Sequence, residues 1–174
     1  MPKIIDNIED KILTEAKLQM LSEGGYDSMT IRSVAKSCGI AVGTFYNYFS
    51  SKEKLAAYVM LDDWNKLTED TRKSLKDSGP EEGIHKIFNM IRQFSSIYEI
   101  VWKQSNTVTK KPAVVSGDYH GMIVREIEDL IKIVIDKPDD PYLITFLAEI
   151  LINLASNGYT EYKQIKPMIN KLIY

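Results

Sequence analysis

Between residues 24 and 55 the sequence concentrates hydroxyl, amide and amino side chains that can form hydrogen bonds with a nucleic acid. The stretch reads as two short helices on either side of a tight turn at Gly39, which is the geometry of a helix-turn-helix. In that geometry Ile40, Phe45 and Phe49 hold the second helix from below. The positions left facing outward, where a DNA groove could receive them, are Ala41, Val42, Thr44, Asn47 and Tyr48.

The charge of the chain is uneven in the direction that DNA binding requires. Residues 24–60 carry a net charge of +2, although the chain of 174 residues has a net charge of −2. Arg32 and Lys36 supply part of the positive charge on the first of the two helices. A negative total argues weakly against unspecific binding of nucleic acid, but it leaves a local binding site open.

Patterns of catalysis or metal binding are missing from the sequence. It has no Ser-His-Asp arrangement, phosphate loop or dinucleotide fingerprint, and His85 and His120 stand apart without HExxH or CxxC partners. Cys38 is the one cysteine, so an intrachain disulfide is excluded and a reducing cytoplasm fits. We therefore expect a protein that is not an enzyme and holds no cofactor and no metal.

A set of aromatic residues in the later part of the chain has two interpretations. The first is hydrophobic core, which is the usual place of such side chains. The second is the lining of an apolar cavity for a small effector. The candidate ligand-binding residues are Trp64, Phe94, Tyr98, Trp102 and Phe146.

Apolar residues recur at helical spacing along almost the whole chain, and no alternating strand pattern is present. Gly24-Gly25 is expected to end the first helix, and Thr30 to cap the second. Ser50 is expected to cap the fourth helix, with Glu53 at the reciprocal position. Helices are predicted over residues 6–23, 30–39, 41–49, 51–76, 81–102, 119–136 and 141–156, and in a last segment that Pro167 kinks or restarts.

We expect an all-α fold with two domains. Residues 1–50 would form a three-helix helix-turn-helix domain, and residues 51–174 an antiparallel helical bundle for effector binding and dimerisation, connected by helix 51–76. Helix 141–156 and the C-terminal segment are too apolar for a peripheral position. They are buried either within one chain or, as we favour, in a homodimer. No apolar run is long enough to cross a membrane.

The segment from about residue 8 to residue 60, a third of the chain, resembles the DNA-binding domain of the TetR family of bacterial transcription regulators. Many fixed positions agree at the spacing of that family, which makes the likeness specific. They are Gly25-Tyr26, Thr30, Val34-Ala35, Gly39-Ile40, Gly43-Thr44, Tyr46, Tyr48-Phe49, Ser51-Lys52-Glu53 and Leu55. The rest of the chain resembles the family only in being helical.

The resemblance implies roles for the matching residues. Thr30 and Lys52 would contact phosphates at helix starts, where backbone N–H groups also favour anions. Asn47 could pair with an adenine edge. The family usually has a serine where Ala41 stands and often a basic or polar residue where Val42 stands, so Val42 could only touch a thymine methyl. The expected DNA-binding set is Thr30, Arg32, Val42, Gly43, Thr44, Tyr46, Asn47, Tyr48 and Lys52.

These observations leave three functions to compare. The favoured one is a repressor that binds a near-palindromic operator as a dimer and is released by a small apolar or amphipathic effector. The second is an architectural or cell-division factor that binds DNA on the same scaffold without a ligand. The third is a helical enzyme or carrier in which the N-terminal motif is vestigial.

Overall fold

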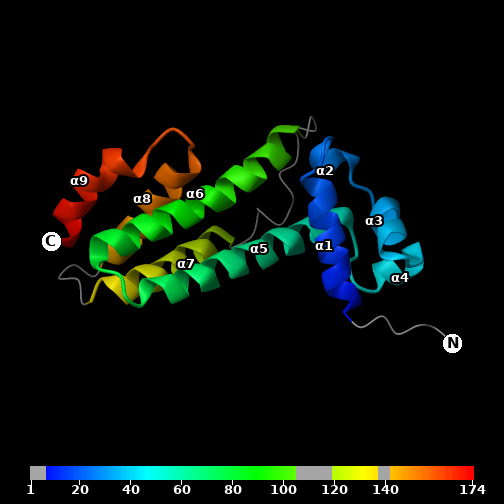
Figure 1. Ribbon diagram of the computed structural model, residues 1–174, viewed down its shortest axis with the longest axis horizontal. Helices are drawn as coiled ribbons and strands as arrows, with labels where there is room; N and C mark the ends of the chain where they lie inside the picture. Colours follow the sequence, from blue (N-terminus) through cyan, green and yellow to red (C-terminus); the bar gives the residue numbers. More distant parts are fainter. Residues whose placement is uncertain (1–6, 105–118, 137–141) are drawn as a thin grey trace. The chain divides into compact units, whose positions relative to one another are not determined.

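The computed structural model describes residues 7–104, 119–136 and 142–174, and for residues 99–104 and 119 it describes the backbone only. Over these residues the chain forms helices and no strand, which confirms the all-α prediction (Figure 1). The helices are α1 (Ile8–Met20), α2 (Gly25–Ser28), α3 (Ile31–Cys38), α4 (Val42–Tyr46), α5 (Lys52–Leu75), α6 (Pro80–Gln104), α7 (Tyr119–Val134), α8 (Leu143–Ser156) and α9 (Tyr162–Ile173).

The chain divides into two compact units, and two long helices contribute to both of them. The first unit holds α1–α4, α5 up to Asp62 and α6 from Ile97. The second unit holds α5 from Asp63, α6 up to Ser96, and α7, α8 and α9. None of the helices that the structure describes combines the length and the apolar composition needed to cross a bilayer.

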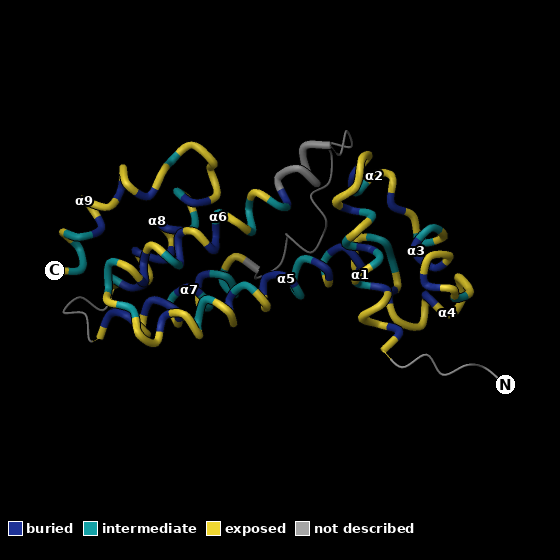
Figure 2. The backbone as a smooth tube through the Cα atoms, viewed as in Figure 1, coloured by how far each residue is buried: buried dark blue, intermediate teal, exposed yellow. Residues whose placement is uncertain are grey.

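In the first unit, α1 and α3 pack against each other through small and branched apolar side chains. Ile12 and Ala16 of α1, four residues apart and so on one helix face, are fully buried, and Val34 of α3 is fully buried as well. Figure 2 shows this one-sided burial along the helices. Lys11 Nζ donates a hydrogen bond of 3.0 Å to the Cys38 carbonyl and so joins α1 to the end of α3.

The prediction that Gly24-Gly25 ends the first helix is wrong, because α1 ends at Met20 with Leu21 as its C-cap. Gly24 has a φ of 93°, and the chain then forms α2, a single turn that the sequence analysis missed. A side chain at Gly24 would place its Cβ 2.8 Å from the Cβ of Ser28. A one-turn helix is too short to show an apolar period, and its glycine start looks like a helix end.

The helix caps agree with the prediction at one position and differ at another. The Thr30 side chain accepts a hydrogen bond from the Ser33 backbone N–H, and Ser33 Oγ accepts one from the Thr30 N–H, each at 3.0 Å. At α5 the predicted cap Ser50 is wrong, because Ser51 Oγ accepts the bond from Lys54 N–H at 3.2 Å. The helix therefore starts one residue later, and Glu53 is not at the reciprocal position.

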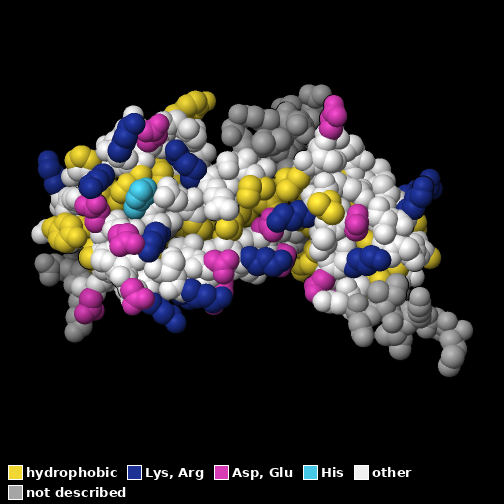
Figure 3. All heavy atoms as spheres, in the orientation of Figure 1, with side chains coloured by type: hydrophobic (Ala, Val, Ile, Leu, Met, Phe, Trp, Pro, Cys, Tyr) yellow, Lys and Arg dark blue, Asp and Glu magenta, His cyan; other side chains and the backbone are white. Residues whose placement is uncertain are grey.

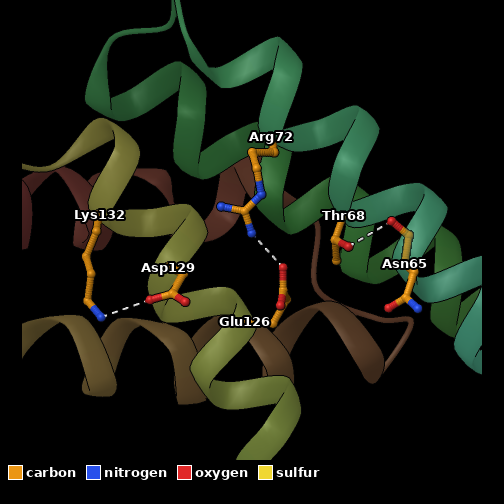
Figure 4. A network of polar contacts seen from close by, with 6 residues as sticks. All are labelled: Asn65, Thr68, Arg72, Glu126, Asp129 and Lys132. Atoms are coloured by element: carbon orange, nitrogen blue, oxygen red, sulfur yellow. Dashed lines mark hydrogen bonds and ion pairs between the residues drawn. The ribbon is translucent and has the colours of Figure 1, made fainter.

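The second unit is built around a continuous apolar core from all five of its helices. α6 and α7 approach closely at Gly83, where an added Cβ would lie 2.5 Å from Val134 Cγ1. α5 and α7 are joined by Arg72, whose guanidinium donates to Glu126 at 2.6 Å (Figure 4). Both of these contacts join segments that are far apart in the sequence.

The last two helices bury one face and leave apolar side chains outside. Leu147 and Leu151 of α8 are fully buried, whereas Phe146 is 52% exposed. Gly158 has a φ of 73° in the connection to α9, where the sequence predicted that it closes the helix before it. α9 continues through Pro167 without a restart.

Candidate nucleic-acid interface

The second helix of the helix-turn-helix, α4, presents its side chains to solvent. Val42 is 37% and Tyr46 51% exposed, and Tyr48, in the turn after α4, is 43% exposed. Gly43, Thr44 and Asn47 are exposed as well, so the face expected to point outward does so. Contacts of these residues with DNA stay a prediction.

Two phenylalanines fix the orientation of α4 from below. Phe45 is fully buried and Phe49 is 1% exposed, and their ring centroids lie 5.9 Å apart. Phe49 in turn packs edge-on against Tyr58 of α5 at 5.5 Å. Tyr46, which could have belonged to the core, touches Phe45 with its ring edge at 5.9 Å and keeps half of its surface outside.

The N-terminus of α4 has no side-chain cap, as the sequence predicted from Ala41. Ala41 has the extended backbone of an N-cap, with φ −69° and ψ 148°, but it makes no side-chain bond to the first turn. Gly43 is the second residue of α4 and lies in this uncapped first turn. A Cβ added to it meets no atom within 4 Å. Packing within the described chain therefore does not require glycine at this position.

Thr30 is held at the start of α3 by a network that reaches α1. Thr30 is exposed, and Ser33, its partner in the cap, places its hydroxyl 2.6 Å from Gln19 Oε1. The network fixes the direction of the Thr30 hydroxyl while leaving its outer side accessible. Arg32, two residues after Thr30, is exposed and adds positive charge to α3.

Lys52, the first residue of α5, is positioned by residues of α2. Its ammonium lies 4.2 Å from the centroid of the Tyr26 ring and donates a hydrogen bond of 3.3 Å to the Asp27 carbonyl. Partial burial lowers the pKa of Lys52, and the charges of Asp27 and Glu53 oppose that shift. Burial is also the main cause that raises the pKa of Tyr26 to about 12, so its phenol stays neutral.

Residues 13–59 match the model of a protein family described as bacterial regulatory proteins, tetR family. The match covers α2, α3, α4 and the exposed surface described above. This segment of the chain is therefore similar to the tetR-family regulatory proteins. Thr30, α4 and Lys52 all lie inside the matched segment.

Individual relatives agree with this. The transcriptional regulator UidR of Escherichia coli strain K12 is 33% identical over 87 residues, which are 50% of this chain and 41% of UidR. The uncharacterised regulator YhgD of Bacillus subtilis is 27% identical over 146 residues, 79% of this chain and 76% of YhgD. A transcriptional regulator from Aquifex aeolicus superposes with a TM-score of 0.60 at 18% identity, over 97% of this chain and 100% of its own. The described part of the chain thus shares the all-helical fold of this regulator.

The predicted effector residues have different environments. Trp64 is buried and its ring meets the ring of Phe94 edge-on at 5.1 Å in the core of the second unit. Tyr98 is buried, Phe146 is half exposed, and the side chain of Trp102 lies outside the described residues. Their role in ligand binding stays a prediction.

Two residues that support the interface were not singled out from the sequence. Gln19 reaches the Thr30 cap from α1, and Tyr26 holds Lys52 from a distance of 26 positions. The Gly25-Tyr26 pair belongs to the family pattern, but a contact across that distance leaves no local signal. Cys38 is buried and burial raises the pKa of its thiol, as expected for a residue that fills the turn.

Proposed function

We propose that the protein is a TetR-like transcription regulator that binds operator DNA through α4. The observation that supports this most is the exposed face of α4 over the buried rings of Phe45 and Phe49. Thr30 and Lys52 would bind phosphates beside the groove, and Asn47 would contact a base edge. Two copies of α4 in a dimer would enter successive major grooves of a near-palindromic operator.

The partner copy would cover the outer faces of α8 and α9. Phe146 on α8 is 52% exposed and Met168 on α9 is 43% exposed, and Ile150 lies beside Phe146 on the same helix face. A symmetric pair of such faces would form a four-helix interface. We expect this homodimer to be the form that binds DNA.

A charge placed in this surface should separate the two copies. We expect Phe146→Asp to shift the protein from dimer to monomer in sedimentation velocity, because an unpaired carboxylate would be buried in an apolar contact. Tyr159→Asp is the matched control, since Tyr159 is 90% exposed in the connection before α9. A dimer that persists in the Phe146 variant would refute this interface.

Release from DNA would follow from an apolar or amphipathic effector bound among the helices of the second unit, near Trp64 and Phe94. α5 supplies residues to both units, so a change in its position would reach the DNA-binding unit. Such an effector releases DNA only if it binds the released conformation more tightly than the bound one. With this property the protein would act as a repressor.

The direct test is selection of bound fragments from genomic DNA, followed by fluorescence anisotropy on the selected duplex. We expect salt-sensitive binding that Tyr48→Ala and Lys52→Ala weaken, with a shallower salt dependence in the lysine variant. Lys73→Ala, an exposed lysine of the second unit, is the control. A few selected sites support a regulator, whereas many dispersed sites would favour an architectural factor. Absence of duplex binding would refute the proposal.

A further inference from the structure

A pocket of about 400 Å³ opens within the second unit, between the first half of α6 and the start of α9. This volume lies in the range of small-molecule sites. Trp64 and Phe94 do not line it, so it is separate from the predicted effector residues. Figure 3 shows basic and acidic side chains gathered over α6 and α9, with apolar side chains between them.

Stacked rings form one wall of the pocket. Tyr162 of α9 lies flat against His85 of α6, with centroids 4.1 Å apart, and its other neighbour is Phe88 at 5.5 Å. The guanidinium carbon of Arg92 sits 4.9 Å from the centre of the Phe88 ring. A planar apolar group that entered the pocket would therefore meet ring surfaces beside a cation.

The lining carries more positive than negative charge. Lys163 is paired with Glu161 at 2.6 Å and Lys166 with Glu81 at 2.7 Å. Bonds to these lysines lower the pKa of both carboxyls, so the two pairs stay ionised and neutral overall near pH 7. Arg92 is the remaining cation of the lining.

Arg92 has hydrogen-bonding capacity that the described chain leaves unused. It donates from Nη2 to the Thr160 carbonyl, which ties α6 to the chain before α9. Its Nε is buried without a partner among the described residues, and its charge is one of the causes that lower the pKa of Glu161. A carboxylate is the acceptor that matches a guanidinium best.

We infer that this pocket binds a small aromatic carboxylate, with the carboxylate on Arg92 and the ring beside Phe88 and Tyr162. The anion would bind the guanidinium of Arg92 and balance the surplus positive charge of the lining. The inference concerns the second unit alone, and it holds whether or not the protein binds DNA.

Benzoate is a suitable probe, and the side-chain Nε–H signal of Arg92 in a proton–nitrogen NMR spectrum reports on the site itself. We expect this signal to shift in a saturable way at millimolar benzoate. Benzamide, which has the ring without the charge, and acetate, which has the charge without the ring, should bind more weakly. Arg92→Gln should weaken benzoate binding roughly tenfold to a hundredfold, the loss of a charge-assisted hydrogen bond.

Two further variants keep the test decisive. Lys132→Gln removes an exposed cation of α7 outside the pocket and should leave benzoate binding unchanged. Asn89→Trp fills the pocket from an exposed position and keeps Arg92, so it should abolish binding even if the Arg92 variant fails to fold. Equal binding of benzamide, equal binding of inorganic phosphate, or unchanged binding in the Asn89 variant would each overturn the inference.

Discussion

At the scale of single residues, Lys52 is a charged side chain whose position is set before any ligand arrives. The ring of Tyr26 and the carbonyl of Asp27 hold its ammonium at 4.2 Å and 3.3 Å. A free lysine side chain loses about 2 kcal/mol of rotamer entropy when it is fixed. In the folded protein the side chain of Lys52 has already lost part of this entropy, which would favour the proposed contact with a phosphate.

Tyr26 should therefore affect DNA binding without touching DNA. We expect Tyr26→Leu to weaken binding to the selected duplex a few-fold, since a cation–π contact contributes about 0.5–1 kcal/mol at such sites. Tyr26→Phe keeps the ring and should bind like the unchanged protein. In fluorescence anisotropy, the loss should disappear when both proteins also carry Lys52→Ala. An equal loss with and without Lys52 would contradict the role.

The packing of the described chain does not require glycine at position 43. A methyl group there meets nothing within 4 Å, and alanine favours a helix over glycine by about 0.5–1 kcal/mol. We expect Gly43→Ala to keep or raise stability in urea unfolding but to lower DNA affinity at least tenfold, because the backbone of α4 could no longer approach the duplex. Gly79→Ala, also in open space, is the control for DNA binding. Unchanged affinity in the Gly43 variant would mean that α4 does not come this close.

At the scale of elements, the cap of α3 and the outward face of α4 could be predicted from the sequence because their causes are local. Thr30 caps α3 through Ser33, which is three positions away. The buried rings that orient α4, Phe45 and Phe49, stand within or just after that helix. α2 could not be predicted, since four residues carry no period and Gly24 resembles a helix end. At α5 two serines stand in a row, and only the backbone geometry decides that Ser51 is the cap.

The contact of α6 with α7 depends on the absence of a side chain. We expect Gly83→Ala to destabilise the protein by about 1–3 kcal/mol in urea unfolding, because its Cβ would lie 2.5 Å from the stiff, branched side chain of Val134. Adding Val134→Ala should recover part of the loss. A double variant less stable than Gly83→Ala alone would show that the two positions do not share one contact.

At the scale of the whole molecule, each unit contains a tyrosine that the fold keeps neutral. Burial is the main cause that raises the pKa of Tyr26 and of Tyr162 from 10.0 to about 12. Between pH 10 and pH 12 the unfolded chain thus holds fewer protons than the folded one. The stability that these phenols contribute is complete below pH 10 and is lost as the pH rises toward 12.

We expect urea unfolding midpoints to fall through this alkaline range, and Tyr26→Phe and Tyr162→Phe each to make the fall shallower. At pH 8 the phenols are neutral in both states, and Tyr162→Phe should lose only the hydrogen bond that the phenol donates to the Glu81 carbonyl, about 1 kcal/mol. A decline with the same slope in all three proteins would assign the alkaline loss to other groups.

The tertiary contacts of the second unit could not be predicted, because they join residues far apart in the sequence. Arg92 meets Thr160 across 68 positions, and Glu81 meets Asn170 across 89. Helical periodicity shows which face of α6 or α9 is apolar, but many pairings of such faces satisfy it. Because the pairing of helix faces is open, the sequence also could not decide whether the aromatic residues line a ligand cavity or belong to the core.

Since α5 is one continuous helix with residues in both units, insertions and deletions within it should be poorly tolerated. One residue inserted into an α-helix turns everything beyond it by about 100° and moves it 1.5 Å along the axis. In α5, which supplies residues to both units, such an insertion would turn the helix residues on one side of it against those on the other, whereas loops absorb length changes at the surface. We therefore expect natural variants of this protein to differ in loop length while the number of residues between Lys52 and Leu75 stays constant.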